Sequence, residues 1–224
     1  MKITWIGQAG LFIETQGLKI MVDPYLSDSV VKVNPRNFRR KSIDKRFLEI
    51  QPDVLICTHN HLDHLDPETV PHYLQREQSV LTLGPASCFE ELKKFGGSHN
   101  YVKFDRHVEW TERGVLFKAV KAEHSDATPI GVIISDGEQK IYITGDTLYN
   151  EEIFADIDTD IDVLFLPING VGNNMNMTDA ARFAKKVSAK KVVPLHWGMF
   201  DELTPDDFKV DNKVIPEIYK EIAI

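Results

Sequence analysis

Cysteine is scarce in this sequence, which has only Cys57 and Cys88 among its 224 residues. The two show neither C-x-x-C spacing nor the density of a disulfide-stapled secreted domain, so a reducing compartment fits. No apolar run approaches the ~18 residues of a membrane span, and Met1 to Glu14 contain no apolar signal segment. We therefore expect a cytoplasmic protein with no membrane span.

An excess of positive charge is also missing. Lys and Arg number 26 against 34 Asp and Glu, which gives a net charge of −8. A protein that binds nucleic acid without regard to sequence needs a basic face, so we do not expect nucleic acid as the main partner. The length is enough for one sizeable core, and we expect residues 1–224 to form a single domain.

Short β-prone runs alternate with helical signals along the whole chain, and no fixed-period repeat is visible. The expected strands are Lys2–Ile6, Leu11–Thr15, Lys19–Val22, Val54–Cys57, Val115–Ala122, Ile130–Ser135, Lys140–Thr144, Val163–Leu166 and Val192–Pro194. One helix is expected from Asp66, as its cap, to about Gln75, and another after a cap at Thr178. Residues 27–46 are expected to be irregular. The simplest closure is an α/β fold with two mixed sheets and outer helices.

The segment from Thr58 to Asp66 carries three histidines and two aspartates directly after an apolar run. His59 and His61 are two residues apart on a chain leaving a strand, so they can point the same way. Asp63 and His64 follow as the chain turns. Nitrogen and oxygen ligands without a thiolate suit Zn²⁺, Mn²⁺ or Fe²⁺ better than Ca²⁺ or Mg²⁺, so this cluster predicts a metal site.

Three further polar residues stand at the ends of expected strands. His124, Asp146 and His196 each follow an apolar run directly. A single histidine at such a place is more often a structural residue, but α/β folds also build their sites where strand ends gather at one edge. Three such residues beside the Thr58–Asp66 cluster favour one shared site.

These residues and their order resemble the five motifs of the metallo-β-lactamase superfamily over nearly the whole chain. Asp23 matches the first motif, His59, His61, Asp63 and His64 the second, His124 the third, Asp146 the fourth and His196 the fifth. The resemblance implies a four-layer αββα sandwich with two divalent metal ions. His59, His61 and His124 would hold one ion, Asp63, His64 and His196 the other, and Asp146 would bridge them. Asp23 would hold a ligand histidine by a hydrogen bond.

Such a centre predicts hydrolysis. Two divalent ions about 3.5–4 Å apart share a water and bring its pKa toward 7, so that hydroxide is the nucleophile at neutral pH. Asp63 and Asp146 are the expected catalytic carboxylates. If a free oxygen of Asp63 reaches the hydroxide, it could orient it or take its proton. Zinc or manganese is expected, with iron as a further candidate.

Within the superfamily, several segments resemble the UlaG-like (L-ascorbate-6-phosphate lactonase-like) branch of cytosolic hydrolases. They are Ile3–Gly10, Asp23-Pro24, Pro167–Gly170, Asn176–Thr178 and Pro194–Trp197. The resemblance implies a small anionic ester as substrate, first of all a lactone. Two alternatives stay open, a phosphodiesterase on the same metal centre and a non-catalytic metal-binding protein.

Seven cations crowd the acidic chain between Lys32 and Arg46. They form either a solvated loop or an anion-recognising lid, in which Arg39 and Arg40 would contact the substrate. Asn169 opens a Gly- and Asn-rich loop that could border the pocket or serve turn chemistry alone. Short strands at the N-terminal end could form a homo-oligomer, and no feature selects an oligomeric state.

The remaining candidates are expected outside the site. His72 is expected on a helix surface, and His99 and His107 fall outside all five motifs. Trp197 follows His196 directly, and we expect it to close the core rather than wall the pocket.

Overall fold

Apolar residues alternate between the two faces of each central strand, and both faces are buried. In the computed structural model, which describes residues 1–224, Val54 and Ile56 face a second sheet while Leu55 between them faces helices. Val163 and Phe165 face the first sheet in the same way, and Leu164 points outward. Burial on both faces explains why these runs are continuously apolar rather than alternating with polar residues.

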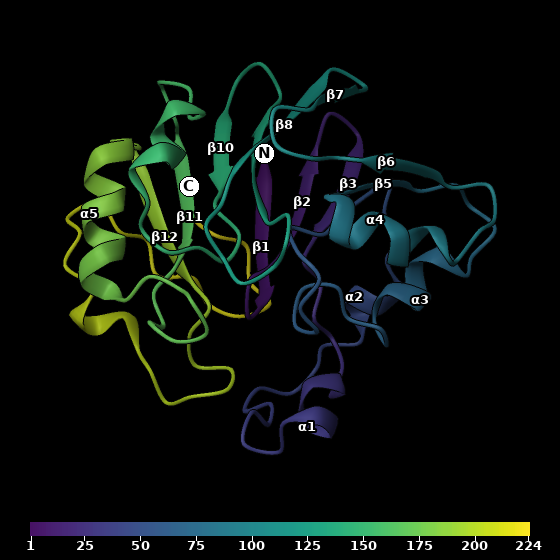
Figure 1. The fold of residues 1–224 in the computed structure, drawn as a ribbon, viewed down its shortest axis with the longest axis horizontal. Helices are drawn as coiled ribbons and strands as arrows, with labels where there is room; N and C mark the ends of the chain where they lie inside the picture. Colours follow the sequence, from purple (N-terminus) through teal and green to yellow (C-terminus); the bar gives the residue numbers. More distant parts are fainter.

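Two six-stranded mixed sheets result, and Figure 1 shows them face to face. The first runs in the order β1-β2-β3-β4-β5-β6, with β1 Lys2–Gly7, β2 Gly10–Thr15, β3 Leu18–Val22, β4 Val54–Ile56, β5 Leu81–Gly84 and β6 Asn100–Lys103. The second runs in the order β12-β11-β10-β9-β8-β7, with β7 Glu109–Glu112, β8 Val115–Lys121, β9 Ile130–Ser135, β10 Lys140–Ile143, β11 Val163–Pro167 and β12 Lys191–Leu195.

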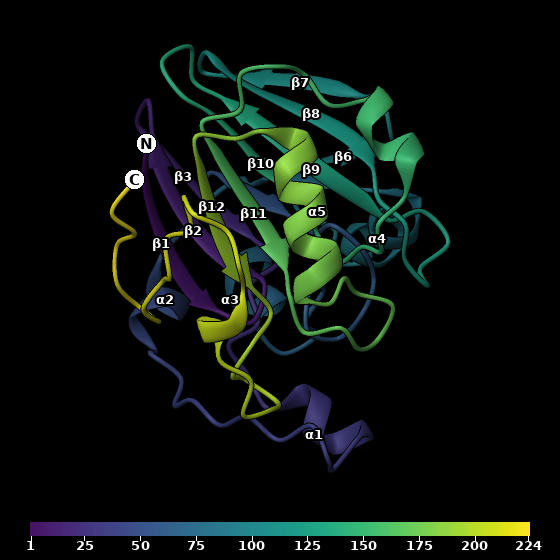
Figure 2. The same ribbon diagram turned by 90° about the vertical axis from the view of Figure 1, so that its left-hand side faces the viewer.

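The chain has five helices, and all but the first lie on the outer faces of the sheets (Figures 1 and 2). They are α1 Ser29–Val33, α2 Arg46–Glu49, α3 Val70–Leu74, α4 Ala86–Lys93 and α5 Met177–Val187, with 3₁₀ turns η1 Glu151–Ala155 and η2 Pro205–Asp207. Helices α2, α3 and α4 lie on the first sheet, α5 lies across the second, and α1 stands apart below the strands (Figures 1 and 2). The expected four-layer αββα sandwich of two mixed sheets with outer helices is confirmed.

The C-terminal segment closes the free edge of β1. The amide of Ile222 donates to the Ile3 carbonyl at 2.8 Å, and Thr4 and Glu221 form an antiparallel bridge. Both chain termini therefore lie at the same end of the first sheet (Figure 1). The longest helix, α5, has 11 residues, and none of the helices combines the length and apolarity that a membrane crossing needs.

Every expected strand is present, with ends within one residue of those predicted. The helix expected from Asp66 begins instead at Val70, because Asp66 to Thr69 form a preceding turn in which the Asp66 carboxylate accepts from the amide of Glu68. The cap of α5 is Asn176, not Thr178, since its side chain accepts from the amide of Asp179 at 2.9 Å.

Residues 27–46 are less irregular than expected, because α1 and the first residue of α2 lie within them. Strands β5, β6 and β7 were not foreseen. β6 and β7 are the outer strands of their sheets and carry polar, half-exposed residues, so they lack the apolar pattern of a central strand.

Candidate metal centre

The strands that carry the candidate site residues all end at one edge of the sandwich. β1 and β3 are both antiparallel to β2, and β4 is parallel to β3. In the second sheet β8 and β10 are both antiparallel to β9, and β11 and β12 are parallel to β10. The carboxyl ends of these strands deliver Asp23 after β3, His59 to His64 after β4, His124 after β8, Asp146 after β10 and His196 after β12.

The first group combines both sheets. His59, His61 and His124 offer ring nitrogens that all lie within 4.8 Å of one another. His124 Nε2 is 3.1 Å from His61 Nδ1, and the His59 and His124 rings meet edge to face with centroids 4.7 Å apart. The His59 ring is fully buried. Three imidazoles that converge on one point in this way are a donor set for a transition metal.

The second group lies beside the first. Asp63, His64 and His196 also offer donor atoms within 4.8 Å of one another, and His196 Nε2 is 3.3 Å from Asp63 Oδ2. Asp146 stands between the groups: its Oδ1 is 3.4 Å from His64 Nε2, and its Oδ2 is 3.1 Å from His196 Nε2 and 3.9 Å from His124 Nε2. One carboxylate therefore reaches histidines of both groups.

Asp23 holds His64 through the ring nitrogen that does not face the other donor atoms. Its Oδ1 accepts from the amide of Thr58 at 2.7 Å, and its Oδ2 accepts from the Thr58 hydroxyl at 2.6 Å. His64 Nδ1 lies 2.8 Å from the same Oδ2. A proton on Nδ1 that points at Asp23 leaves Nε2 with its lone pair facing Asp146 and Asp63, which is the tautomer that a metal needs.

Backbone geometry aims several of these residues. The φ angles of Asp23, His196 and Gln8 are 43°, 59° and 51°. They lie in the left-handed region of backbone conformation, which residues other than glycine rarely adopt. Each follows the last residues of a strand, so the unusual φ turns its side chain from the sheet into the site. Residues held in such conformations concentrate where the surrounding fold over-determines them, often at functional sites.

The buried carboxylates of the site stabilise positive charge on the histidines beside them. Burial tends to lower the pKa of His64, but the carboxylates of Asp146 and Asp23 outweigh it and raise this pKa well above the usual value. Burial also tends to lower the pKa of His196, but the carboxylates of Asp146 and Asp63 outweigh it and raise this pKa to about 10. The protein without a metal thus compensates its aspartates with protons, and a divalent cation can take the place of those protons.

The histidines of the first group behave differently. Burial holds the pKa of His59 well below its usual value, and burial also lowers that of His124. Both rings are therefore neutral at pH 7, and a neutral imidazole is the form that coordinates a metal.

Several donor atoms lack partners. His59 Nε2, His64 Nε2 and Asp146 Oδ1 are buried and make no hydrogen bond. A buried polar atom without a partner costs free energy, so such atoms are rare unless a bound group satisfies them. The three atoms belong to the groups described above, and their nitrogen and oxygen chemistry fits Zn²⁺, Mn²⁺ or Fe²⁺. The residues present therefore fit the metals that the sequence led us to expect.

Two residues of the site escaped the sequence analysis. Gln8 Nε2 donates to Asp63 Oδ2 at 2.7 Å and lies 3.0 Å from His196 Nε2. Asn174 Nδ2 donates to Asp146 Oδ2 at 2.8 Å. The only local signal for Gln8 was its place at the end of a strand, in the β1–β2 turn, where a glutamine is unremarkable.

A cavity of about 550 Å³ opens onto the centre, and Asp63, Asp146 and His196 are part of its lining. Asn169 also lines this cavity, and its Oδ1 is buried without a hydrogen-bond partner. The Asn169 loop, for which the sequence left a pocket border and plain turn chemistry both open, therefore lies beside this cavity.

Of the two interpretations of the basic segment between Lys32 and Arg46, the contacts of Arg39 and Arg40 do not support the substrate-binding lid, although Asn37 of this segment lines the cavity. Arg39 donates to the Tyr25 carbonyl at 3.0 Å and to the Tyr219 hydroxyl at 3.1 Å, and Arg40 donates to the Phe200 carbonyl. Neither guanidinium lines the cavity. Both guanidinium groups therefore anchor the basic segment to the rest of the chain.

The other expectations about single residues agree with their contacts. Trp197 stacks on Trp5 with centroids 5.0 Å apart, against the core. His99 bonds the backbone of Val80 and Leu74, and His107 pairs with Asp156. His72 is exposed on α3.

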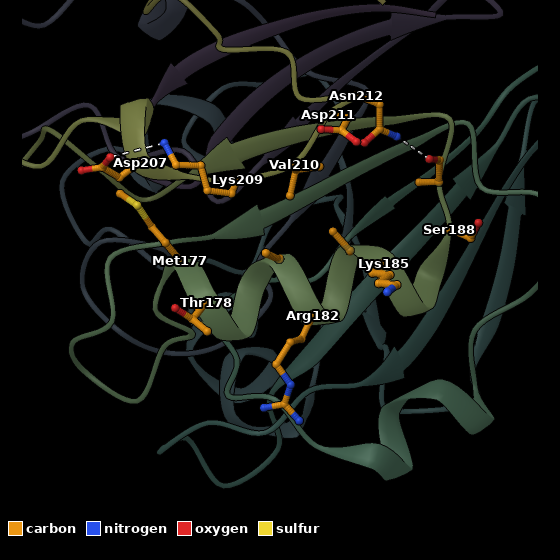
Figure 3. A pocket seen from close by; sticks show the side chains of 13 residues that line it. Met177, Thr178, Arg182, Lys185, Ser188, Asp207, Lys209, Val210, Asp211 and Asn212 are labelled. Carbon is orange, nitrogen blue, oxygen red and sulfur yellow. Dashed lines mark hydrogen bonds and ion pairs between the residues drawn. The ribbon is translucent and has the colours of Figure 1, made fainter.

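A larger hollow, of about 730 Å³, lies away from the centre, between α5 and residues 207–212 (Figure 3). Its polar side chains include Arg182, Lys185 and Lys209, but no histidine or cysteine lines it. It therefore offers no imidazole or thiolate to hold a transition metal, and we place the chemistry at the strand ends.

Comparison with known proteins agrees with this picture. A family model described as the beta-lactamase superfamily domain matches residues 2–196. A UPF0173 metal-dependent hydrolase of Carboxydothermus hydrogenoformans is 28% identical to this chain over 224 residues, which cover 95% of this chain and 92% of the relative.

Solved structures share the fold at lower identity. A metallo hydrolase of the archaeon Ignicoccus hospitalis superposes with a TM-score of 0.72 at 22% identity, covering 98% of this chain and 96% of that one. An isothiocyanate hydrolase from Delia radicum gut bacteria superposes with a TM-score of 0.76 at 18% identity, covering 100% and 99%.

Proposed function

Since the chain belongs to the beta-lactamase superfamily, we propose that it is a dinuclear metal-dependent hydrolase that cleaves a small ester, first of all a lactone. One observation carries the proposal. Two groups of histidine and aspartate donors from both sheets meet around Asp146, with buried atoms that have no other partner. The naming of a relative as a metal-dependent hydrolase supports it.

We assign His59, His61 and His124 to one ion, Asp63, His64 and His196 to the other, and Asp146 to both. The proximity of Asp146 to His64, His124 and His196 supports the shared role. Zinc or manganese, with iron as a third candidate, fits the donor set.

Divalent ions held there would lower the pKa of water toward neutrality and polarise the carbonyl of the substrate. The protein's own residues would orient the attacking water and hold the carboxylates in place. Asp63 lines the cavity, where a carboxylate oxygen can orient the attacking water and take its proton. Gln8 and Asn174 keep the carboxylates of Asp63 and Asp146 in place through their amide donors.

Asp23 completes this support. Its bond to His64 Nδ1 fixes the orientation of that ring, while Thr58 satisfies the remaining lone pairs of the carboxylate. Side chains that hold a metal ligand in this way preorganise the site before a metal or substrate arrives.

The finer placement in the UlaG-like branch rests on the segments Pro167–Gly170 and Pro194–Trp197. In the structure they lie at the carboxyl ends of β11 and β12 and present Asn169 and His196 to the cavity. This placement favours a carbonyl ester over a phosphodiester. Two free, buried cysteines support the cytoplasm as its location.

The test compares wild-type protein with Asp146→Ala. Both are purified with manganese or zinc, their metal content is measured by elemental analysis, and a panel of lactones and aryl esters is offered. We expect wild-type protein to hold two ions and to hydrolyse members of the panel. Because Asp146 contacts both groups, the variant should lose turnover by at least about 10³-fold and hold less metal while keeping its circular dichroism spectrum. Wild-type protein that holds two ions and cleaves nothing on the panel would speak for the non-catalytic alternative.

A further inference from the structure

The cavity above the centre has no cation in its lining, and Asp201 is its one charged residue outside the donor groups. The 15 residues that form it include no lysine and no arginine. Its carboxylates at the floor, Asp63 and Asp146, belong to the donor groups. The remaining one, Asp201, is already engaged, since its Oδ1 accepts from the amides of Gly198 and Leu203 at 2.8 and 3.0 Å.

Three cations of the neighbouring basic segment have partners within the protein. Arg39 and Arg40 bind the Tyr25 and Phe200 carbonyls, and Lys32 pairs with Glu68 at 2.6 Å. A phosphate or carboxylate on a substrate would thus find no positive side chain in the lining itself. A charge left without a partner in a partly desolvated cavity is expensive.

Much of the remaining lining of the cavity consists of apolar side chains and side-chain amides. Val30, Val171 and Phe200 line the cavity, and Val171 is 62% exposed there, on the loop after β11. Asn37 and Asn169 add side-chain amides, and Asn169 Oδ1 is buried without a hydrogen-bond partner. Small-molecule sites have this make-up: apolar walls that provide affinity, and a few polar groups that orient the ligand.

Resting on the hydrolase proposed above, we propose that this site selects an uncharged substrate, with an apolar group against Val171 and Phe200 and a hydrogen-bonding group at Asn169. This departs from the anionic substrate that the resemblance to the UlaG-like branch implied, and for which the basic segment between Lys32 and Arg46 was a candidate lid. The specificity follows from the absence of cations in the lining together with exposed apolar surface at the cavity mouth.

The experiment uses three aryl esters of one chain length on metal-loaded protein. They are p-nitrophenyl hexanoate, the same ester with a terminal sulfonate, which is a poor metal ligand, and the same ester with a terminal trimethylammonium group. We expect kcat/KM for the uncharged ester to exceed that of each charged ester by about tenfold or more. Equal rates, or a preference for either charged ester, would overturn the inference and leave the hydrolase standing.

A pair of variants locates the selectivity. Val171→Lys places a cation at the cavity mouth and should raise the relative kcat/KM of the sulfonate ester by about threefold or more. Ile215→Lys makes the same change at an apolar residue that is 45% exposed and lies outside the cavity, and the ratio should not move. Equal shifts in both variants would show that the cavity lining does not set the preference.

Failure of the hydrolase is distinguishable from failure of this inference. If metal-loaded protein cleaves none of the three esters and no member of the lactone panel, the ester-hydrolase function is wrong. Binding of hexanamide and of its sulfonate-terminated analogue, followed by saturation-transfer NMR, then decides the inference. Tighter binding of hexanamide supports an uncharged ligand, and equal or weaker binding overturns it.

Discussion

At the scale of single residues, the candidate centre depends on contacts made behind the metal-facing atoms. The Asp23 carboxylate accepts hydrogen bonds from the amide and hydroxyl of Thr58 and lies beside His64 Nδ1. With the proton of His64 on Nδ1, all three partners are donors and both oxygens of the Asp23 carboxylate accept. This makes Asp23 the residue through which the orientation of His64 can be tested without touching a metal-facing atom.

Asp23→Asn should weaken metal binding by about 10- to 100-fold, because an amide NH₂ would face donors and His64 would lose its fixed tautomer. The measurement is zinc or manganese affinity by competition with a chromophoric chelator. Asp126→Asn is the matched control, since Asp126 accepts from the amide of Asn60 on the same loop but contacts no histidine. Equal losses in both variants would mean that Asp23 only stabilises the loop.

At the scale of the elements, α5 shows how an outer helix is tied to its sheet. Phe183 is fully buried and meets Phe154, Tyr149 and Tyr142, with the Phe154 centroid at 4.9 Å. The helix starts at a capped end and finishes at Ser188 in a left-handed conformation. Its apolar face packs on β10 and β11, whose carboxyl ends carry Asp146 and Asn169.

Phe183→Ala should lower the free energy of unfolding by about 3–5 kcal/mol, since it leaves a cavity among aromatic side chains that cannot collapse around it. Urea denaturation followed by circular dichroism measures the loss. Lys185→Ala, an exposed change on the same helix, should stay within about 0.5 kcal/mol of wild type. A loss below about 1 kcal/mol for the buried variant would contradict the packing described for α5.

At the scale of the whole molecule, the site spans the two sheets, so it exists only while the sheets stay packed together. Asp23 and His59 come from the first sheet, and Asp146 and His196 from the second. A contact away from the centre also joins the sheets: the Thr15 hydroxyl at the end of β2 donates to Asp136 in the β9–β10 turn at 2.5 Å.

This contact should make stability depend on pH. Burial tends to raise the pKa of Asp136, but hydrogen bonds from Thr15 and from the amides of Gln139 and Glu138 outweigh it and lower the pKa below its ordinary value of 3.8. A carboxylate with a depressed pKa stabilises the fold above its unfolded-state pKa, and this contribution is lost as the pH falls through the folded-state pKa.

Asp136→Asn should therefore be less stable than wild type at pH 7, with a difference that shrinks below about pH 4. Urea titrations at several pH values measure it. Asp211→Asn, an exposed change, should show no such pH-dependent difference. A difference for Asp136→Asn that stays constant from pH 7 to about pH 3 would be inconsistent with this linkage.

Local patterns were enough for much of the molecule. Apolar runs bounded by turn residues predicted the central strands, because burial on both faces leaves its mark in the residues themselves. The outer strands β6 and β7 were missed because their polar, half-exposed residues become strands only through pairing with a neighbour.

The candidate site divides in the same way. Histidines and aspartates at strand ends indicate a metal site by their residue types. The sequence alone therefore determined which residues meet at the centre, just as its strand and helix patterns determined the α/β class. Only the tertiary structure decided that Gln8 and Asn174 hold the carboxylates, that Arg39 turns to Tyr25 instead of the cavity, and that the lining carries no free cation. Residue type and spacing are local properties, whereas the direction of a side chain and its neighbours depend on contacts between segments far apart in the chain.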